Sequence, residues 1–258
     1  MKKLLAVLVI MLFVAMAGVV QANDFTNGGF ETGDLSGWTG GGGFWYGSPV
    51  LPVPPATYNS GTPNNTIMGI GTDPISGQNT VCNGNYSVRV NDSYNNYSVS
   101  TLSQSVTNYT SKDIYFQWNA VLQASHGLTD SDYFSLTLHD DTTGVDIISR
   151  SYSSASAPGT FTGGYGSDGD WYGSGWQLEH IDLTTAGSGG SSIVGDNFTL
   201  SLLASDCPYG GHAGYVYLDG FAPVVVPPGP STVPEPTSML LLGLGLIGVT
   251  GVRRKFGN

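Results

Sequence analysis

The sequence predicts an all-β fold, an antiparallel β-sandwich, within a chain of 258 residues. Helical periodicity is absent between residues 23 and 222, whereas several short segments alternate apolar and polar residues. The chain contains 38 glycines and 14 prolines, which supply the turns that such strands require. Its hydrophobic content of 40% is sufficient for a core, so the composition argues against wholesale disorder.

Residues 1–22 have the features of a secretory signal peptide. Lys2 and Lys3 precede an apolar run that extends to Val20, and the small residue Ala22 ends a suitable cleavage site. A retained membrane anchor is the alternative, although the run is short for a span of about 20 residues. We therefore expect export, with the mature chain beginning at Asn23.

The clearest predicted strand is residues 112–122, which alternates between two faces. Shorter alternations occur at residues 86–90, 134–138, 198–202 and 215–218, and all belong to one domain predicted for residues 23–222. The face of the long strand that we expect to be core consists of Ile114, Phe116, Trp118, Ala120 and Leu122.

A proline-rich linker, residues 223–233, follows the predicted domain and should be stiff and extended. After it comes an almost wholly apolar stretch, with a transmembrane helix predicted at about residues 238–252. Arg253 and Arg254 then form a basic end, which the positive-inside rule keeps in the cytoplasm. The domain should therefore lie on the outer side of the inner membrane.

The tail of residues 234–258 resembles the PEP-CTERM sorting signal. Pro234, Glu235 and Pro236 precede the apolar helix, and Arg253 and Arg254 follow it, in the order that this signal requires. The resemblance implies a Gram-negative bacterium in which an exosortase-type transpeptidase processes the tail. The remainder would then reach the cell surface or the extracellular matrix. A plain C-terminal membrane anchor is the alternative and gives the same topology.

The predicted domain is strongly acidic. Between residues 23 and 233 the basic residues are Arg89, Lys112 and Arg150, whereas 18 of the chain's 19 acidic residues, all except Glu235, lie in this range. Such a surface repels phosphate polymers, so a nucleic-acid partner is excluded. It tolerates a divalent cation.

The ends of the domain resemble the opening and closing strands of galactose-binding-like jelly-roll domains and carbohydrate-binding modules. Residues 27–38 match the opening strand and residues 215–221 the closing strand. The resemblance implies a jelly-roll-like sandwich whose terminal strands meet, with Glu31 and Asp219 contributing to a structural Ca²⁺ site. Asp168 and Asp170 are a second candidate for calcium. The alternative for all of these acids is an ordinary turn or capping role.

Two cysteines occur in the chain, Cys82 and Cys207, and export places them in an oxidising compartment. We expect them to form a disulfide, with two thiols as the alternative. His212 lies in a glycine-rich segment close to Cys207. A structural role for this histidine is favoured, because metal ligation would need partners that the sequence does not identify.

Two aromatic, glycine-rich segments could contact a glycan, because sugar C–H faces sit on exposed rings. The alternative is that these rings fill the ends of the core. The candidate residues are Trp45 and Tyr46 in the first segment, and Trp171, Tyr172 and Trp176 in the second.

Catalysis is not expected, since the sequence contains no nucleophile elbow, zinc-protease helix or phosphate-binding loop motif. The prediction is an exported cell-surface or matrix protein that acts as a non-catalytic polysaccharide-binding or adhesion module. A purely structural matrix protein is the alternative. A secreted glycan hydrolase is a third possibility, because a carboxylate pair can form in space without a sequence motif.

Overall fold

The computed structural model describes residues 24–47, 51, 53–58, 61–124, 126–127, 131–156 and 161–221. All of them belong to one compact unit, Met1–Val225. The predicted signal peptide, linker and sorting tail lie outside these residues, as does the helix predicted at 238–252. Within the described part of the chain, no helix is both long and apolar enough to cross a membrane.

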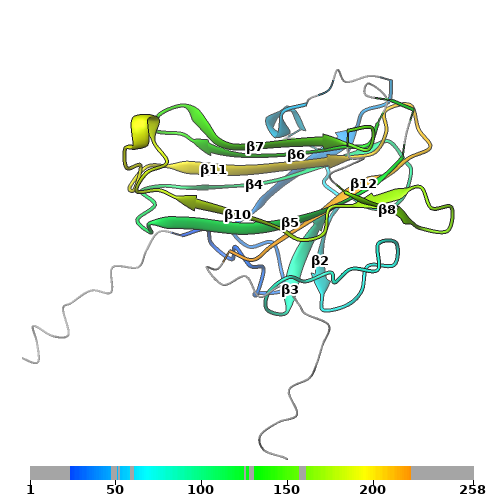
Figure 1. The fold of residues 1–258 in the computed structure, drawn as a ribbon, viewed down its shortest axis with the longest axis horizontal. Helices are drawn as coiled ribbons and strands as arrows, with labels where there is room; N and C mark the ends of the chain where they lie inside the picture. Colours follow the sequence, from blue (N-terminus) through cyan, green and yellow to red (C-terminus); the bar gives the residue numbers. More distant parts are fainter. Residues whose placement is uncertain are drawn as a thin grey trace, which may run out of the picture. The chain divides into compact units, whose positions relative to one another are not determined.

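Two antiparallel sheets form the fold, as the sequence predicts (Figure 1). The first sheet has five strands in the order β1-β4-β11-β6-β7. Their bounds are Thr39–Phe44 for β1, Ser98–Val106 for β4, Phe198–Ser205 for β11, Tyr133–Asp140 for β6 and Val145–Ser153 for β7.

The second sheet has seven strands in the order β2-β3-β12-β5-β9-β8, with β10 also paired to β5. Two short 3-10 helices, η1 (Pro55–Tyr58) and η2 (Ser188–Gly190), lie in the connections. The strand bounds are Asn65–Gly69 for β2, Tyr86–Val90 for β3, Gly214–Asp219 for β12, Asp113–Gln123 for β5, Trp171–Gly173 for β9, Thr162–Tyr165 for β8 and Gln177–Asp182 for β10.

The main core lies between the two sheets. Leu102, Leu136 and Leu200 come from β4, β6 and β11 of the first sheet, and Val216 comes from β12 of the second. Every residue of the predicted core face of β5 is buried, so that prediction is confirmed. The four shorter predicted strands are confirmed as β3, β6, β11 and β12.

The opening segment corrects one prediction. Residues 27–38 form turns, and the first strand, β1, begins after them at Thr39. The expectation that the two ends of the domain meet is correct, because a Cβ at Gly28 would lie 2.7 Å from the Phe221 ring. Glycine also allows β1 to pack closely, since a Cβ at Gly42 would lie 2.5 Å from the Val99 carbonyl oxygen.

Candidate functional site

Trp45, a predicted glycan-binding residue, is part of the core. It is only 4% exposed and packs in a cluster with Val53, Val99 and Leu203. Its indole Nε1 donates a hydrogen bond of 2.8 Å to the Asp206 carbonyl oxygen. The prediction that Trp45 offers an exposed ring is therefore wrong, because the loops at this end of the sandwich cover it.

The second predicted aromatic segment covers the outer face of β12. Trp171 is 8% exposed, and its ring lies 6.0 Å from that of Tyr215. Trp176 is half-buried and donates from Nε1 to the Asn79 carbonyl oxygen at 3.0 Å. Tyr172 is also half-buried and packs against the main core. Trp171 is therefore not an exposed ring, whereas Tyr172 and Trp176 keep part of their surface accessible to solvent.

Tyr46, by contrast, is 77% exposed, and other exposed rings lie at strand ends and in loops at the same end of the sandwich. Phe44 is 75% exposed, Tyr94 73% and Tyr209 55%. We call these four residues, together with the half-buried Tyr97, the aromatic loop cluster. Its members come from the end of β1, the β3–β4 loop and the β11–β12 loop.

Specific contacts join these three loops. The rings of Tyr46 and Tyr97 meet edge to face with centroids 5.0 Å apart. The Gly47 N–H donates to the Pro208 carbonyl oxygen at 2.9 Å, and the Gly211 N–H donates to Asn95 Oδ1 at 2.8 Å. The exposed rings therefore project from loops that are held to one another.

The buried Asp206 side chain fixes the base of the cluster. Its Oδ2 accepts hydrogen bonds of 2.9 Å from the backbone N–H groups of Asn96 and Ser98, and Oδ1 accepts one from Asn91 Nδ2. Burial raises the pKa of Asp206 to about 6, although these hydrogen bonds oppose that rise. The carboxyl group thus holds the β3–β4 loop against the end of β11.

The sequence reasoning missed Phe44, Tyr94, Tyr97 and Tyr209 as a group. Tyr94 lies in a turn-rich segment, and Tyr209 lies in a glycine-rich one, so each is locally a plausible exposed ring. Their association depends on contacts between loops separated by more than 100 residues, as in the bond between Gly211 and Asn95. No local pattern reports such contacts.

Glu31 and Asp219, the predicted calcium ligands, both hold the loop before β3. Glu31 Oε1 accepts from the backbone N–H groups of Asn85 and Tyr86 at 2.8 and 3.1 Å. Asp219 Oδ2 accepts from the N–H groups of Cys82 and Asn83 at 2.8 and 2.9 Å. We call this pair and the 82–86 loop the carboxylate clamp.

The two acids of the clamp differ in pKa. Burial raises the pKa of Asp219 to about 7, and the Glu31 charge acts in the same direction. At Glu31, burial also acts to raise the pKa, but hydrogen bonds from Asn85 and Tyr86 outweigh it and lower the pKa.

The clamp suits calcium only in part. Glu31 accepts three hydrogen bonds and Asp219 accepts three, which leaves about one acceptor site on each carboxylate. Calcium takes 6–8 oxygen ligands, so most would have to be carbonyls or waters.

Asp168 and Asp170 are the second predicted pair of calcium ligands. Asp170 Oδ2 accepts a hydrogen bond of 2.8 Å from Gln123 Nε2. Neither Asp168 nor Asp170 belongs to a ligand group of three or more among the described residues.

No disulfide joins Cys82 and Cys207, so that prediction is wrong for this structure. The Cys82 N–H contacts Asp219 at the end of β12, whereas the Cys207 N–H bonds the His212 carbonyl oxygen just before β12 begins. A six-residue strand covers roughly 17 Å, and a disulfide needs Cα atoms within about 7 Å. The two thiols are therefore separated by the length of β12.

A shallow groove lies on the outer face of the first sheet. It has a volume of about 280 Å³ and lies beside η1. Its lining includes hydroxyl groups of Thr137, Thr199 and Ser201 from β6 and β11. Phenylalanine, tyrosine and tryptophan are absent from this lining, so the groove lacks the stacking surface that the aromatic loop cluster has.

Residues 232–255 match the PEP-CTERM protein-sorting motif. This match agrees with the resemblance of the tail and indicates export, with a C-terminal sorting signal that implies processing by an exosortase. The search of curated proteins found no match.

Solved structures with similar folds include carbohydrate-binding modules. The module TmCBM61, solved with β-1,4-galactotriose, is 12% identical over 77% of this chain and 94% of its own, with a TM-score of 0.39. CBM27-1 of Caldicellulosiruptor saccharolyticus, solved with mannohexaose, is 11% identical over 74% of this chain and 92% of its own, with a TM-score of 0.36. The enzymatically active domain of the bacteriophage CBA120 tailspike protein 4 is 14% identical over 77% of this chain and 20% of its own, with a TM-score of 0.34. The chain thus carries a PEP-CTERM sorting motif after an antiparallel β-sandwich domain.

Proposed function

We propose that this exported chain is a non-catalytic polysaccharide-binding module of the cell surface or extracellular matrix, and that it binds through the aromatic loop cluster. The observation that carries the proposal is the set of exposed rings on loops that are hydrogen-bonded to one another. Phe44, Tyr46 and Tyr94 are each at least 73% exposed, which is unusual for large apolar rings without a partner.

The chemistry of the cluster suits a sugar chain. Aromatic faces receive the C–H surfaces of pyranose rings, and tyrosine hydroxyls can exchange hydrogen bonds with sugar hydroxyls. The neighbouring Asn95 and Asn96 add amide groups beside the rings. Because the acidic domain repels phosphate polymers and anionic lipid, a neutral polysaccharide is the favoured class.

The positions of the two glutamates of the domain support a binding role. Glu31 accepts three hydrogen bonds from the 82–86 loop. Glu179 is buried in a bidentate ion pair with Arg150 and also accepts from Trp118 Nε1. Both carboxylates therefore serve the protein's own groups rather than a solvent-facing cleft.

The test is a glycan array with the full chain, kept soluble in a detergent that contains no sugar. We expect saturable binding that the substitutions Tyr46→Ala and Tyr94→Ala each weaken roughly threefold to tenfold, the value of one lost ring contact. Tyr86→Ala is the matched control, because Tyr86 is an exposed tyrosine at the carboxylate clamp. It should leave binding unchanged.

Three results would count against the proposal. Equal losses in the Tyr86→Ala control would move binding away from the aromatic loop cluster. Sugar release into the supernatant would favour a glycan hydrolase. Absence of binding to every glycan would favour a purely structural matrix protein.

A further inference from the structure

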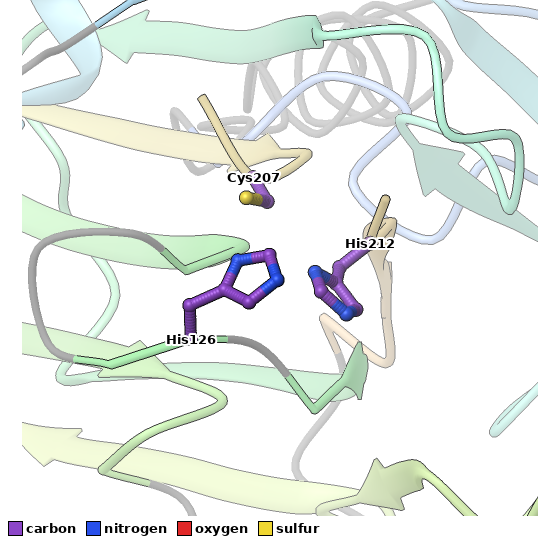
Figure 2. Close-up of side chains that lie close together, drawn as sticks. All are labelled: His126, Cys207 and His212. Carbon is purple, nitrogen blue, oxygen red and sulfur yellow. The ribbon is translucent and has the colours of Figure 1, made fainter. Parts of the chain in front are cut away.

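Three potential metal ligands converge beside the loop that carries Tyr209. The ligand atoms of His126, Cys207 and His212 all lie within 4.8 Å of one another. Figure 2 shows the Cys207 sulfur and the two imidazole rings grouped around a common space. Among the described residues this is the one group of three or more histidine, cysteine or acidic side chains with such spacing.

Backbone hydrogen bonds set the positions of two of these residues. The Cys207 N–H donates to the His212 carbonyl oxygen at 3.0 Å, and the Gly210 N–H donates to the Cys207 carbonyl oxygen at 3.2 Å. Gly210 and Gly211 have φ values of 89° and 100°, a region that favours glycine, so the tight loop depends on them. Four residues separate Cys207 from His212, a spacing within the range found between zinc ligands.

The third ligand is brought in from the end of β5. The Gln123 N–H donates to the Ala213 carbonyl oxygen, and the Ala213 N–H donates to Gln123 Oε1, both at 3.1 Å. These two bonds join the last residue of β5, three residues before His126, to the residue after His212. The rings of His126 and His212 consequently lie edge to face with centroids 4.7 Å apart.

We propose that His126, Cys207 and His212 bind a transition-metal ion, with Zn²⁺ as the preferred ion. Thiolate and imidazole are ligands for zinc and similar metals, whereas calcium and magnesium prefer oxygen. For one ion to lie about 2.3 Å from the sulfur and 2.0–2.1 Å from each nitrogen, the three ligand atoms must move slightly closer together. Water would occupy the fourth position.

The surroundings favour a cation. The domain is acidic overall, and between residues 23 and 233 its basic residues are only Arg89, Lys112 and Arg150. Cys207 is itself buried, whereas His126 is exposed, so an ion would enter from the His126 side. On binding, the Cys207 S–H bond breaks, its proton passes to solvent and the S–metal bond forms, with no change in oxidation state.

Cobalt is a suitable probe, because it substitutes for zinc and its bond to thiolate absorbs in the near ultraviolet. The full chain, stripped with chelator and kept reduced, should bind one equivalent of Co²⁺ with this absorption band, and Zn²⁺ should displace it. Cys207→Ser should abolish the band. His126→Ala and His212→Ala should each weaken binding at least tenfold, about the loss seen even for outer-shell groups.

Matched controls are available in the same chain. Cys82→Ser removes the other thiol, and His180→Ala removes a histidine that is paired with Asp113 at 2.7 Å. Both variants should bind Co²⁺ as the unaltered chain does. Loss of the band in either control, or its retention in Cys207→Ser, would overturn the proposal.

A measurement on the unaltered chain avoids the risk that a variant fails to fold. X-ray absorption of the zinc-loaded chain should show one sulfur at about 2.3 Å and nitrogen neighbours at about 2.0 Å. A shell of nitrogen and oxygen alone, or failure to retain zinc, would refute the site.

Discussion

The carboxylate clamp and the aromatic loop cluster lie at opposite ends of β12, and they use their side chains differently. In the clamp, Glu31 and Asp219 each accept backbone hydrogen bonds from the 82–86 loop, so their polar atoms face the protein itself. In the cluster, backbone and amide groups hold the loops together, and rings such as Tyr46 face solvent. The first end uses its polar side chains to hold the fold, whereas the second leaves aromatic rings exposed to solvent.

This comparison shows that residue type alone does not indicate a role. Trp45 and Tyr46 are neighbours in sequence, yet one is 4% exposed and the other 77%. Glu31 and Asp219 are acids that suggest a cation, but most of their acceptor capacity is already used. The direction in which a side chain faces decides whether it stabilises the fold or meets a ligand.

The largest effect is expected beneath the aromatic loop cluster. Trp45→Ala removes a buried indole and leaves a cavity, so it should lower the free energy of unfolding by about 3–5 kcal/mol. Tyr46→Ala, the adjacent change at an exposed ring, should alter it by no more than about 0.5 kcal/mol. Denaturant unfolding of the two variants measures this difference. Equal losses would show that the two rings are not separated into core and surface.

A pH effect of intermediate size is expected at the carboxylate clamp. Because the pKa of Asp219 is raised to about 7 from an ordinary value of 3.8, the folded chain binds a proton more tightly than the unfolded chain. The stabilisation that Asp219 provides is fully present below about pH 4 and is lost as the pH rises through about 7. Its contribution to the free energy of unfolding should fall by about 2 kcal/mol between pH 5 and pH 7. Unfolding measured in chelator should show this decline.

Asp219→Asn should reduce the pH dependence without removing it, because burial also raises the pKa of Asp132 and Asp206. An unchanged slope of stability against pH would show that Asp219 titrates normally.

The Asp219→Asn variant also tests the predicted calcium site, since an ion bound at the clamp would favour ionised Asp219. Added Ca²⁺ at pH 8 should then raise the melting temperature of the unaltered chain but not of Asp219→Asn. No shift would exclude the predicted calcium site.

The smallest effect is expected from Glu31→Ala. Glu31 lies at the surface, so water can replace part of what its carboxylate provides to the 82–86 loop. We expect a loss of about 1 kcal/mol, with faster amide exchange at Asn85 and Tyr86 than in the unaltered chain. Glu31→Gln is the control, because its amide oxygen can still accept one bond. Unchanged exchange in Glu31→Ala would show that the loop does not depend on the clamp.

Several features of the fold could be predicted from the sequence because they are local. Alternation over residues 112–122 identified β5 and its buried face, since side chains on a strand alternate between two sides. β1 was not predicted, because its glycine-rich sequence shows no alternation of apolar and polar side chains. β4 was not predicted for the same reason, since it is serine-rich and eight of its nine residues are wholly or partly buried.

The sequence by itself determined the sorting motif at residues 232–255, the turn-rich all-β class and the inward face of the central strand. These depend on composition and on spacing within one segment. Tertiary structure decided which aromatic rings are exposed, what the acids contact, and that Cys207 meets His126 and His212 rather than Cys82. The physical reason is that these outcomes depend on loops meeting across the sandwich, as in the bond from Trp45 to Asp206, 161 residues apart. Patterns within one short segment of the sequence do not indicate such long-range contacts.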